Sequence, residues 1–203
     1  MGESDVNRGL TNRRGKLGSI FGATALGCGL LVGGATLIVR QNPTMFLEVA
    51  AAKGITPAIS PIIKLGADQA GKNSALEIAA YYGRSDAVVL LLKEGADVHE
   101  NDDTAPLAAV IGGDTDTVRA ILDRGVDANA LDGTLLVWAS RFGNTDTVRL
   151  LLDRGADIHA LNDAALSAAK RGKHTETVLL LIERGGDSQT SHPVTRLHLS
   201  PQG

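Results

Sequence analysis

Cysteine, aromatic residues and catalytic motifs are all scarce in this chain of 203 residues. The single cysteine, Cys28, excludes an intrachain disulfide and leaves the redox compartment open. Aromatic residues amount to one Trp, two Tyr and three Phe. No nucleophile motif, phosphate-binding loop or metal-binding motif occurs. The sequence therefore predicts a protein without catalysis, cofactor or bound metal.

Clustered positive charge is also missing from most of the chain. Residues 1–42 carry five Lys or Arg and two acids, whereas residues 43–203 carry fifteen Lys or Arg and twenty-one acids. Nucleic-acid binding needs clustered cations, so this acidic balance argues against a nucleic-acid partner. The segment 190–203 has two prolines and few apolar residues, and we expect it to be disordered.

What the chain does contain is a repeat marked by glycine. Five near-copies of one phrase (KLGAD, KEGAD, DRGVD, DRGAD, ERGGD) follow one another at spacings of 29, 30, 30 and 30 residues, with their glycines at Gly66, Gly95, Gly125, Gly155 and Gly185. A fixed period in this range indicates stacked supersecondary units. One such unit cannot bury its apolar face alone, so its neighbours must cover it. The repeat predicts a solenoid with a long binding surface.

Each copy has the pattern of two helices. The second helix shows an i, i+3, i+4 apolar face, as in Val88, Leu91 and Leu92. A shorter Ala-rich helix precedes it, at 75–82 in this copy. Alignment at 30 residues brings small residues into one buried column: Ala79, Ala109, Ala139 and Ala169. With a degenerate first copy, helix pairs are expected near 44–65, 74–94, 104–124, 134–154 and 164–184.

The expected helix ends carry matching polar signals. We assign the N-cap of the second helix to a hydroxyl residue in four copies: Ser85, Thr115, Thr145 and Thr175. Arginine occupies the last turn, where the helix dipole favours a cation, at Arg124, Arg154 and Arg184. The glycine that follows suits a left-handed backbone.

These residues resemble ankyrin repeats. The segments ALEIAAYYGRSDAVVLLLKEGADV (75–98) and RFGNTDTVRLLLDRGADIHA (141–160) carry the resemblance, which extends over about 44–189. It implies an all-α, ankyrin-like helix-turn-helix solenoid of about five short repeats that binds another protein. The repeat is 30 residues rather than the usual 33 or so. The hairpin finger between repeats is therefore expected to be short and without clean strands.

The resemblance also implies where a partner would bind. Partners of ankyrin relatives meet the fingers and the exposed end of the first helix, and aromatic residues and Arg dominate binding hot spots. At the helix end the candidates are Tyr81, Tyr82, Ile111, Arg141, Phe142 and Arg171; in one finger they are Asp97, Asp102 and Asp103. Tyr82 and Phe142 share a column that would alternatively pack between layers, and Trp138 is interpreted as a packing residue. The finger acids would alternatively form a solvated edge.

His99 and His159 are candidate metal ligands, but the distance expected between them argues against a shared metal site. They occupy one repeat column two copies apart, and layers spaced by about 8–10 Å would hold them roughly 20 Å apart. They therefore cannot share a metal. His174 falls in the inter-helix turn, where ankyrin repeats often carry histidine, and a structural role is favoured.

Residues 17–39 form an uncharged apolar segment of 23 residues. As a helix it would span roughly 35 Å, enough for a bilayer core. Cations precede it at Arg8, Arg13, Arg14 and Lys16, so residues 1–16 should stay cytoplasmic and the repeats (43–189) should cross the inner membrane to the periplasm or the exterior. A cleaved signal peptide is the alternative, and a buried soluble helix is a third.

Small residues line one face of that segment. Gly18, Gly22, Ala25, Gly29 and Gly33 lie at helical spacing and would allow close helix packing and self-association; low complexity is the alternative explanation. Three functions remain open: a membrane-tethered scaffold that binds or protects a partner protein, a secreted effector that acts on a host protein, and a small membrane-active protein that assembles through its glycine-rich helix.

Overall fold

The computed structural model describes residues 42–186. All of them belong to the second of the two units into which the chain divides, residues 39–203. The apolar segment 17–39, its glycine face, and the segment 190–203 lie outside the described residues. Nothing within 42–186 forms a helix that is both long and apolar enough to cross a membrane.

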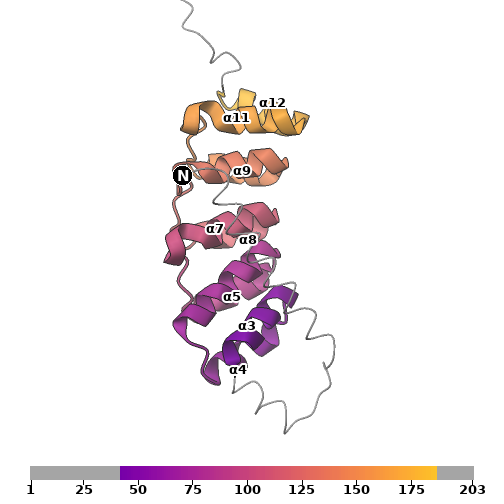
Figure 1. Cartoon of the computed structure of the whole chain (residues 1–203). Coiled ribbons are helices and arrows are strands. Elements are labelled where there is room, and N and C mark those ends of the chain that lie inside the picture. Colours follow the sequence, from indigo (N-terminus) through magenta and orange to yellow (C-terminus); the bar gives the residue numbers. More distant parts are fainter. Residues whose placement is uncertain (1–41, 187–203) are drawn as a thin grey trace, which may run out of the picture. The chain divides into compact units, whose positions relative to one another are not determined.

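The described part of the chain is all-α, with its helices arranged in pairs (Figure 1). The first helix of each pair is α3 (Pro43–Lys53), α5 (Gln69–Tyr81), α7 (Glu100–Gly112), α9 (Thr134–Phe142) or α11 (Ala160–Gly172). Its partner is α4 (Thr56–Lys64), α6 (Ser85–Lys93), α8 (Thr115–Leu122), α10 (Thr145–Asp153) or α12 (Thr175–Glu183). The five expected pairs are thus confirmed.

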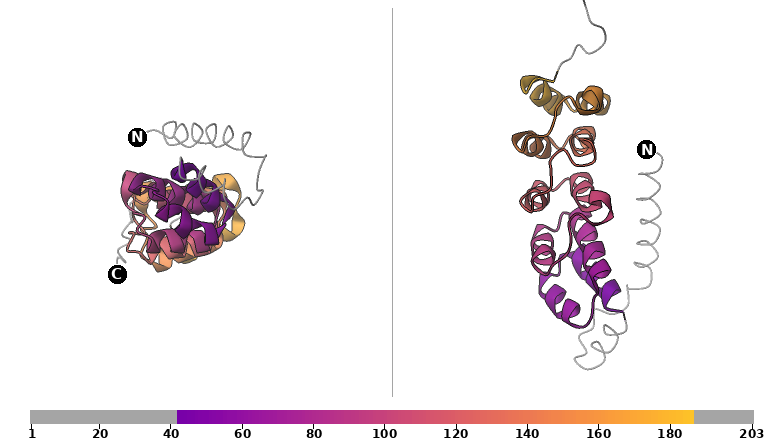
Figure 2. Two further views of the ribbon diagram at one scale, coloured as in Figure 1. Left: turned by 90° about the horizontal axis from the view of Figure 1, so that it is seen from below. Right: turned by 90° about the vertical axis from the view of Figure 1, so that its left-hand side faces the viewer.

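The pairs stack so that like helices become neighbours. The first helices contact one another in the order α3, α5, α7, α9, α11, and the second helices do so in the order α4, α6, α8, α10, α12. Seen along the helices, these rows form two layers (Figure 2, right). The core lies between the rows and between successive pairs, as the solenoid pattern requires.

The aligned apolar columns form this core. All four alanines of the column 79, 109, 139 and 169 are fully buried, and so are Leu91, Ile121, Leu151 and Leu181 of the second helices. Alanine lets the first helices of adjacent pairs approach closely, while the larger residues fill the space between the two layers. The sequence register is therefore correct across the whole described stack.

The turn between paired helices favours glycine for two reasons, its backbone conformation and the close approach of the next pair. Gly113 has φ +80°, a conformation that L side chains rarely adopt. A Cβ on it would also lie 2.9 Å from the Asn144 side chain of the following pair. Lys173 takes the turn position of the last pair with φ +58°. The pairs can stack closely because the turn of one leaves room for a side chain of the next.

Two sequence predictions about helix ends are wrong. The second helices begin at the expected N-cap residues, so the N-caps lie one position earlier, at Arg84, Asp114, Asn144 and His174, and none makes a side-chain capping bond. The first helix α5 begins at Gln69, before the expected residue 74, because polar finger residues add a turn that the apolar pattern does not reveal. The assigned segments of α7 and α11 also start early, but left-handed residues interrupt them up to Asp103 and Asp163, so their regular helix begins near 104 and 164 as predicted.

The fingers are short and contain no strand within 42–186, as the 30-residue period predicts. Several of their non-glycine residues instead adopt left-handed backbone, among them a run of three: Leu161, Asn162 and Asp163. This run interrupts the regular helical backbone of α11 near its start. The finger thus folds back on itself as tight turns, because three residues fewer leave no length for a hairpin.

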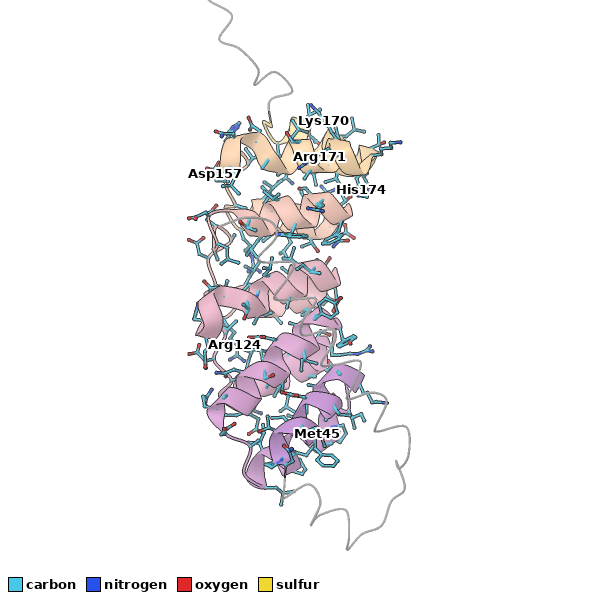
Figure 3. All side chains as sticks on the ribbon, in the orientation of Figure 1. Met45, Arg124, Asp157, Lys170, Arg171 and His174 are labelled. Carbon is cyan, nitrogen blue, oxygen red and sulfur yellow. The ribbon has the colours of Figure 1, made fainter. Side chains whose placement is uncertain are left out.

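The last pair ends the described stack unevenly. Lys170 of α11 is exposed, whereas Ala80, Val110 and Ser140 of the same column are fully buried. The outer face of the last described pair therefore carries a charged side chain at this position (Figure 3). Polar outer faces of this kind are what terminal repeats need. On α12, however, Ile182 is 42% exposed in the column where Leu92 and Leu122 are 6% exposed.

Candidate protein-binding surface

The predicted binding residues at the helix ends gather in one strip. Tyr81, Ile111, Arg141 and Arg171 occupy the same position near the C-terminal ends of α5, α7, α9 and α11. Ile111 and Tyr81 are half-buried, whereas Arg141 and Arg171 are exposed. We call this surface the turn strip, defined by Tyr81, Tyr82, Ile111, Trp138, Arg141, Phe142 and Arg171.

The centre of the turn strip is a cluster on α9. Trp138 and Phe142 stack with ring centroids 5.6 Å apart and an interplanar angle of 27°. The Arg141 guanidinium carbon lies 5.0 Å from the centroid of the Trp138 ring. The three residues are brought together by i, i+3 and i, i+4 spacing on one helix. A cation over an indole ring is attracted by its π-electrons, so the cluster holds a preorganised apolar and cationic surface.

Both aromatic residues of the ambiguous column lie at the surface. Phe142 is 43% exposed and Tyr82 is 37% exposed. Tyr82 packs edge-on against Tyr81, with ring centroids 5.3 Å apart. These ring contacts occur within a repeat, so the interpretation of this column as packing between layers is not supported. Trp138 is half-buried, and its stacking makes it part of the strip rather than only a packing residue.

Side chains from the following repeat fix the backbone beneath the strip. His174 Nε2 donates to the Arg141 carbonyl oxygen at 3.0 Å, and Asn144 Nδ2 donates to that of Val110 at 3.3 Å. Arg84 Nε makes the same kind of bond to Ala52 at 3.1 Å. The predicted structural role of His174 is thereby confirmed. Aspartate stands at the equivalent position 114 and accepts from Thr117 instead.

The predicted finger residues lie at the other end of the first helices. Figure 3 shows Asp157 of one finger at the left-hand end of the stack and His174 at the right-hand end. On α7, Asp103 and Ile111 are eight positions apart, a helical rise of about 12 Å. The structure therefore divides the predicted site residues into two separate groups. The side chain of Asp102 lies outside the described part of the chain.

The finger aspartates have local structural roles. Asp97 Oδ1 accepts from the His99 backbone N–H at 2.9 Å, and Asp127 and Asp157 make equivalent bonds to residues 129 and 159. These are turns closed by an aspartate side chain. The Asp97 N–H also donates to Asn73 Oδ1 at 2.8 Å. The acids therefore shape the fingers, while Asp97 itself remains exposed.

The two repeat-column histidines are engaged in their own fingers. His99 Nδ1 lies 3.1 Å from Asp103 Oδ1, and His159 Nδ1 lies 2.7 Å from Asp163 Oδ1. Within 42–186, no group of three or more His, Cys, Asp or Glu is placed to hold a metal ion. A His-x-x-x-Asp spacing in both fingers is the sequence signal that reveals these pairs.

A shallow open groove of about 530 Å³ lies on the other layer of the stack, between α8 and α10. Its charged lining includes Asp116, Arg119, Asp146 and Arg149. Arg119 is already 4.0 Å from Asp116. No aromatic residue lines the groove, which sets it apart from the turn strip.

Comparison with known families supports the repeat assignment. The family model described as ankyrin repeats, in three copies, matches residues 76–162. This range covers α6 to α10 and parts of their neighbours, including the α9 cluster. Among curated proteins, none matches this chain. Residues 76–162 are therefore ankyrin repeats, a class of domain that generally serves as a scaffold for protein–protein contacts and is typically not catalytic.

Proposed function

We propose that this protein is a non-enzymatic scaffold whose ankyrin repeats hold a partner protein at the turn strip. The observation that carries the proposal is the α9 cluster. Trp138, Arg141 and Phe142 lie in contact on one helix face, with Arg141 and Phe142 exposed to solvent. Tryptophan, tyrosine and arginine are the residues most enriched in binding hot spots. In a chain with so few aromatic residues, four of them lie in this one strip.

The geometry favours the turn strip over the fingers as the main contact. The strip offers rigid aromatic rings over a backbone held by bonds from the next repeat, so little conformational entropy is lost when it binds. The finger acids are committed to their own turns, and exposed rim charges mainly alter association rate and salt dependence. The fingers therefore steer a partner rather than hold it.

Capture experiments test this assignment. With residues 43–203 as bait, Tyr81→Ala combined with Arg141→Ala should abolish recovery of the partner, since truncation of each hot-spot residue costs about 2 kcal/mol or more. Replacing Asp97, Asp102 and Asp103 with Asn is the comparison, and it should weaken binding only slightly. If the double variant still captures the partner and the finger variant does not, the binding site belongs to the fingertips.

The second part of the proposal is that residues 17–39 tether the repeats to the inner membrane. Its support is the uncharged length of this segment and the cations that precede it. The repeats would then stand on the periplasmic side and assist or protect a partner enzyme there. A reporter active only in the periplasm, fused after Gly203, should be active. Neutralising Arg13, Arg14 and Lys16 should weaken that orientation, and activity confined to the cytoplasm would refute it.

A further inference from the structure

Positive and negative side chains occupy different ends of the first helices. The C-terminal ends of these helices and the turns after them carry exposed cations at Lys53, Arg84, Arg141, Arg171 and Lys173. The same positions carry one acid in the described stack, Asp114, and its carboxylate accepts from the Thr117 hydroxyl at 2.6 Å. In a domain that is acidic as a whole, this end of the first-helix layer is basic.

Acidic residues border this basic surface on both sides. The fingers at the opposite end of the first helices expose Asp68, Asp97, Asp127 and Asp157. The first turns of the second helices expose Asp86, Asp116, Asp146 and Glu176. The basic surface is thus confined to the ends of one row of helices.

We propose that the turn strip binds an extended acidic segment of the partner protein, with an apolar side chain of that segment seated against Trp138 and Phe142. This inference rests on the proposed function and specifies the chemistry of the partner. Arg141 and Arg171 face the carboxylates of the segment, because a guanidinium pairs with a carboxylate through two parallel hydrogen bonds. The bordering acids repel basic segments and hold the acidic one in register.

The dimensions suit a single extended chain. From α5 to α11 the strip crosses three interfaces between neighbouring first helices, or about 24–30 Å at a typical helix spacing of 8–10 Å. An extended peptide covers that distance with about seven to nine residues. A nucleic acid duplex is disfavoured, because its phosphates would meet the acids in the first turns of the second helices, two residues beyond the turn positions.

Selection of peptides can test the proposal before the partner protein is identified. A displayed library of random short peptides is panned against the full chain in detergent, against Arg141→Glu with Arg171→Glu, and against Arg119→Glu with Arg149→Glu. The last variant is the matched control, since it reverses two exposed arginines in successive repeats of the other layer. Trp138 is the only tryptophan, so its fluorescence reports occupancy by a tryptophan-free peptide.

The parent chain should select peptides rich in Asp and Glu next to an aromatic or leucine residue. The best of them should shift the fluorescence of Trp138, bind more weakly as salt is raised, and lose roughly 10- to 100-fold in affinity with the Arg141 and Arg171 variant. The Arg119 and Arg149 control should keep the parent affinity. Circular dichroism on both variants shows whether each remains folded.

Three outcomes would overturn the proposal. The selected peptides could lack acidic enrichment, their binding could survive reversal of Arg141 and Arg171, or the control could lose as much affinity. Peptides without acidic bias that still depend on Tyr81 and Arg141 would leave the scaffold function standing and remove only the acidic partner. Failure to select any peptide that needs those two residues would count against both. Concentration-dependent dimers that vanish when Asp97, Asp127 and Asp157 are neutralised would assign the strip to the fingers of a second copy.

Discussion

The two halves of the repeat stack share one backbone plan but join their repeats through different polar contacts. Toward the N-terminus, acids of the first-helix layer receive the bonds: Ser74 Oγ donates to Glu48 at 2.7 Å, and Thr104 Oγ1 donates to Glu77 at 2.7 Å. Glu77 is only 8% exposed. These contacts connect α3 to α5 and α5 to α7. These two contacts therefore place carboxylates between first helices, and Ser60 Oγ donates to Glu94 at 2.6 Å between the second helices α4 and α6.

Toward the C-terminus, hydroxyl groups of the second helices join successive repeats. The Thr115 and Thr147 Oγ1 atoms lie 3.1 Å apart, and those of Thr145 and Thr177 lie 2.9 Å apart. Thr147 and Thr177 are fully buried. Arginines also form solvent-exposed ion pairs with the preceding repeat, Arg154 with Asp123 and Arg184 with Asp153. These arginines therefore link repeats, in addition to the dipole role predicted from the sequence.

The difference shows which contacts define the stack. The buried alanine column runs unchanged through both halves, whereas the polar contacts between repeats change chemistry from one interface to the next. Apolar packing at a constant period sets the geometry, and each interface then satisfies its own polar groups locally. A substitution that disrupts the alanine column should thus unfold either half. The stability lost by disrupting a polar contact between repeats should instead depend on the chemistry of that contact.

The largest effect is expected from the alanine column. Ala139→Asp places a charge without a partner in a fully buried contact between α9 and its neighbours, and we expect a loss of more than about 4 kcal/mol and of cooperative unfolding in residues 43–203. Ala70→Asp makes the same change at an exposed position in the first turn of α5 and should have little effect. Matching thermal melts for Ala139→Asp and the parent would remove Ala139 from the core.

A smaller effect separates the two kinds of repeat glycine. Gly143→Ala forces a Cβ into the His174 ring and into φ +70°, whereas Gly125→Ala meets no atom within 4 Å and bears only the cost of its φ of +89°. We expect about 1–2 kcal/mol for Gly125→Ala and at least twice that for Gly143→Ala. Urea unfolding of both variants gives the comparison, and equal losses would contradict close packing at the turn.

Much of this architecture is encoded locally and could be predicted from the sequence. The columns, the paired helices and the left-handed glycines follow from a 30-residue alignment. The polar joints do not appear at that period, because each one connects residues offset from it: Thr115 to Thr147 and Thr145 to Thr177 are 32 positions apart, and Asp123 to Arg154 is 31 apart. Only the three-dimensional offset between stacked helices brings them together.

The candidate site is predictable in part, because residues in one repeat column lie on the same side of the stack. Shared columns correctly group Tyr81, Ile111, Arg141 and Arg171 along the helix ends. The sequence favours packing for Trp138, because the alignment does not show that a residue one turn earlier stacks on Phe142. The repeat pattern also does not separate the finger acids from the helix ends, since that separation depends on the length of the first helices.

The joints themselves should differ in strength between the two halves. Thr104→Val leaves the nearly buried Glu77 carboxylate without its hydroxyl donor, and hydrogen bonds to charged groups contribute about 1.5–3 kcal/mol. Thr147→Val removes a bond between two neutral hydroxyls and should cost about 1 kcal/mol. Denaturant melts rank the two variants. A larger loss from Thr147→Val would reverse the proposed order.

The smallest effect is expected at the exposed arginine pairs. Arg154 Nη2 lies 2.8 Å from Asp123 Oδ1, but the two side chains are 35% and 56% exposed. Solvent screening limits the stabilisation that such ion pairs provide, so Arg154→Ala should lower the free energy of unfolding by less than about 1 kcal/mol. A stability measurement at high salt should bring the variant and the parent closer together. A loss that exceeds the loss from Thr147→Val would show that these pairs, and not the buried hydroxyl contacts, hold the C-terminal half.

The most direct test of the account is photocrosslinking in cells that produce the full chain. A photoreactive phenylalanine analogue replaces Phe142 of the turn strip in one strain and Asp157 of a finger in another, both at exposed positions. The account predicts a crosslinked partner from position 142 and little or none from position 157. An adduct from position 157 with none from position 142 would contradict the assignment of the turn strip as the binding surface.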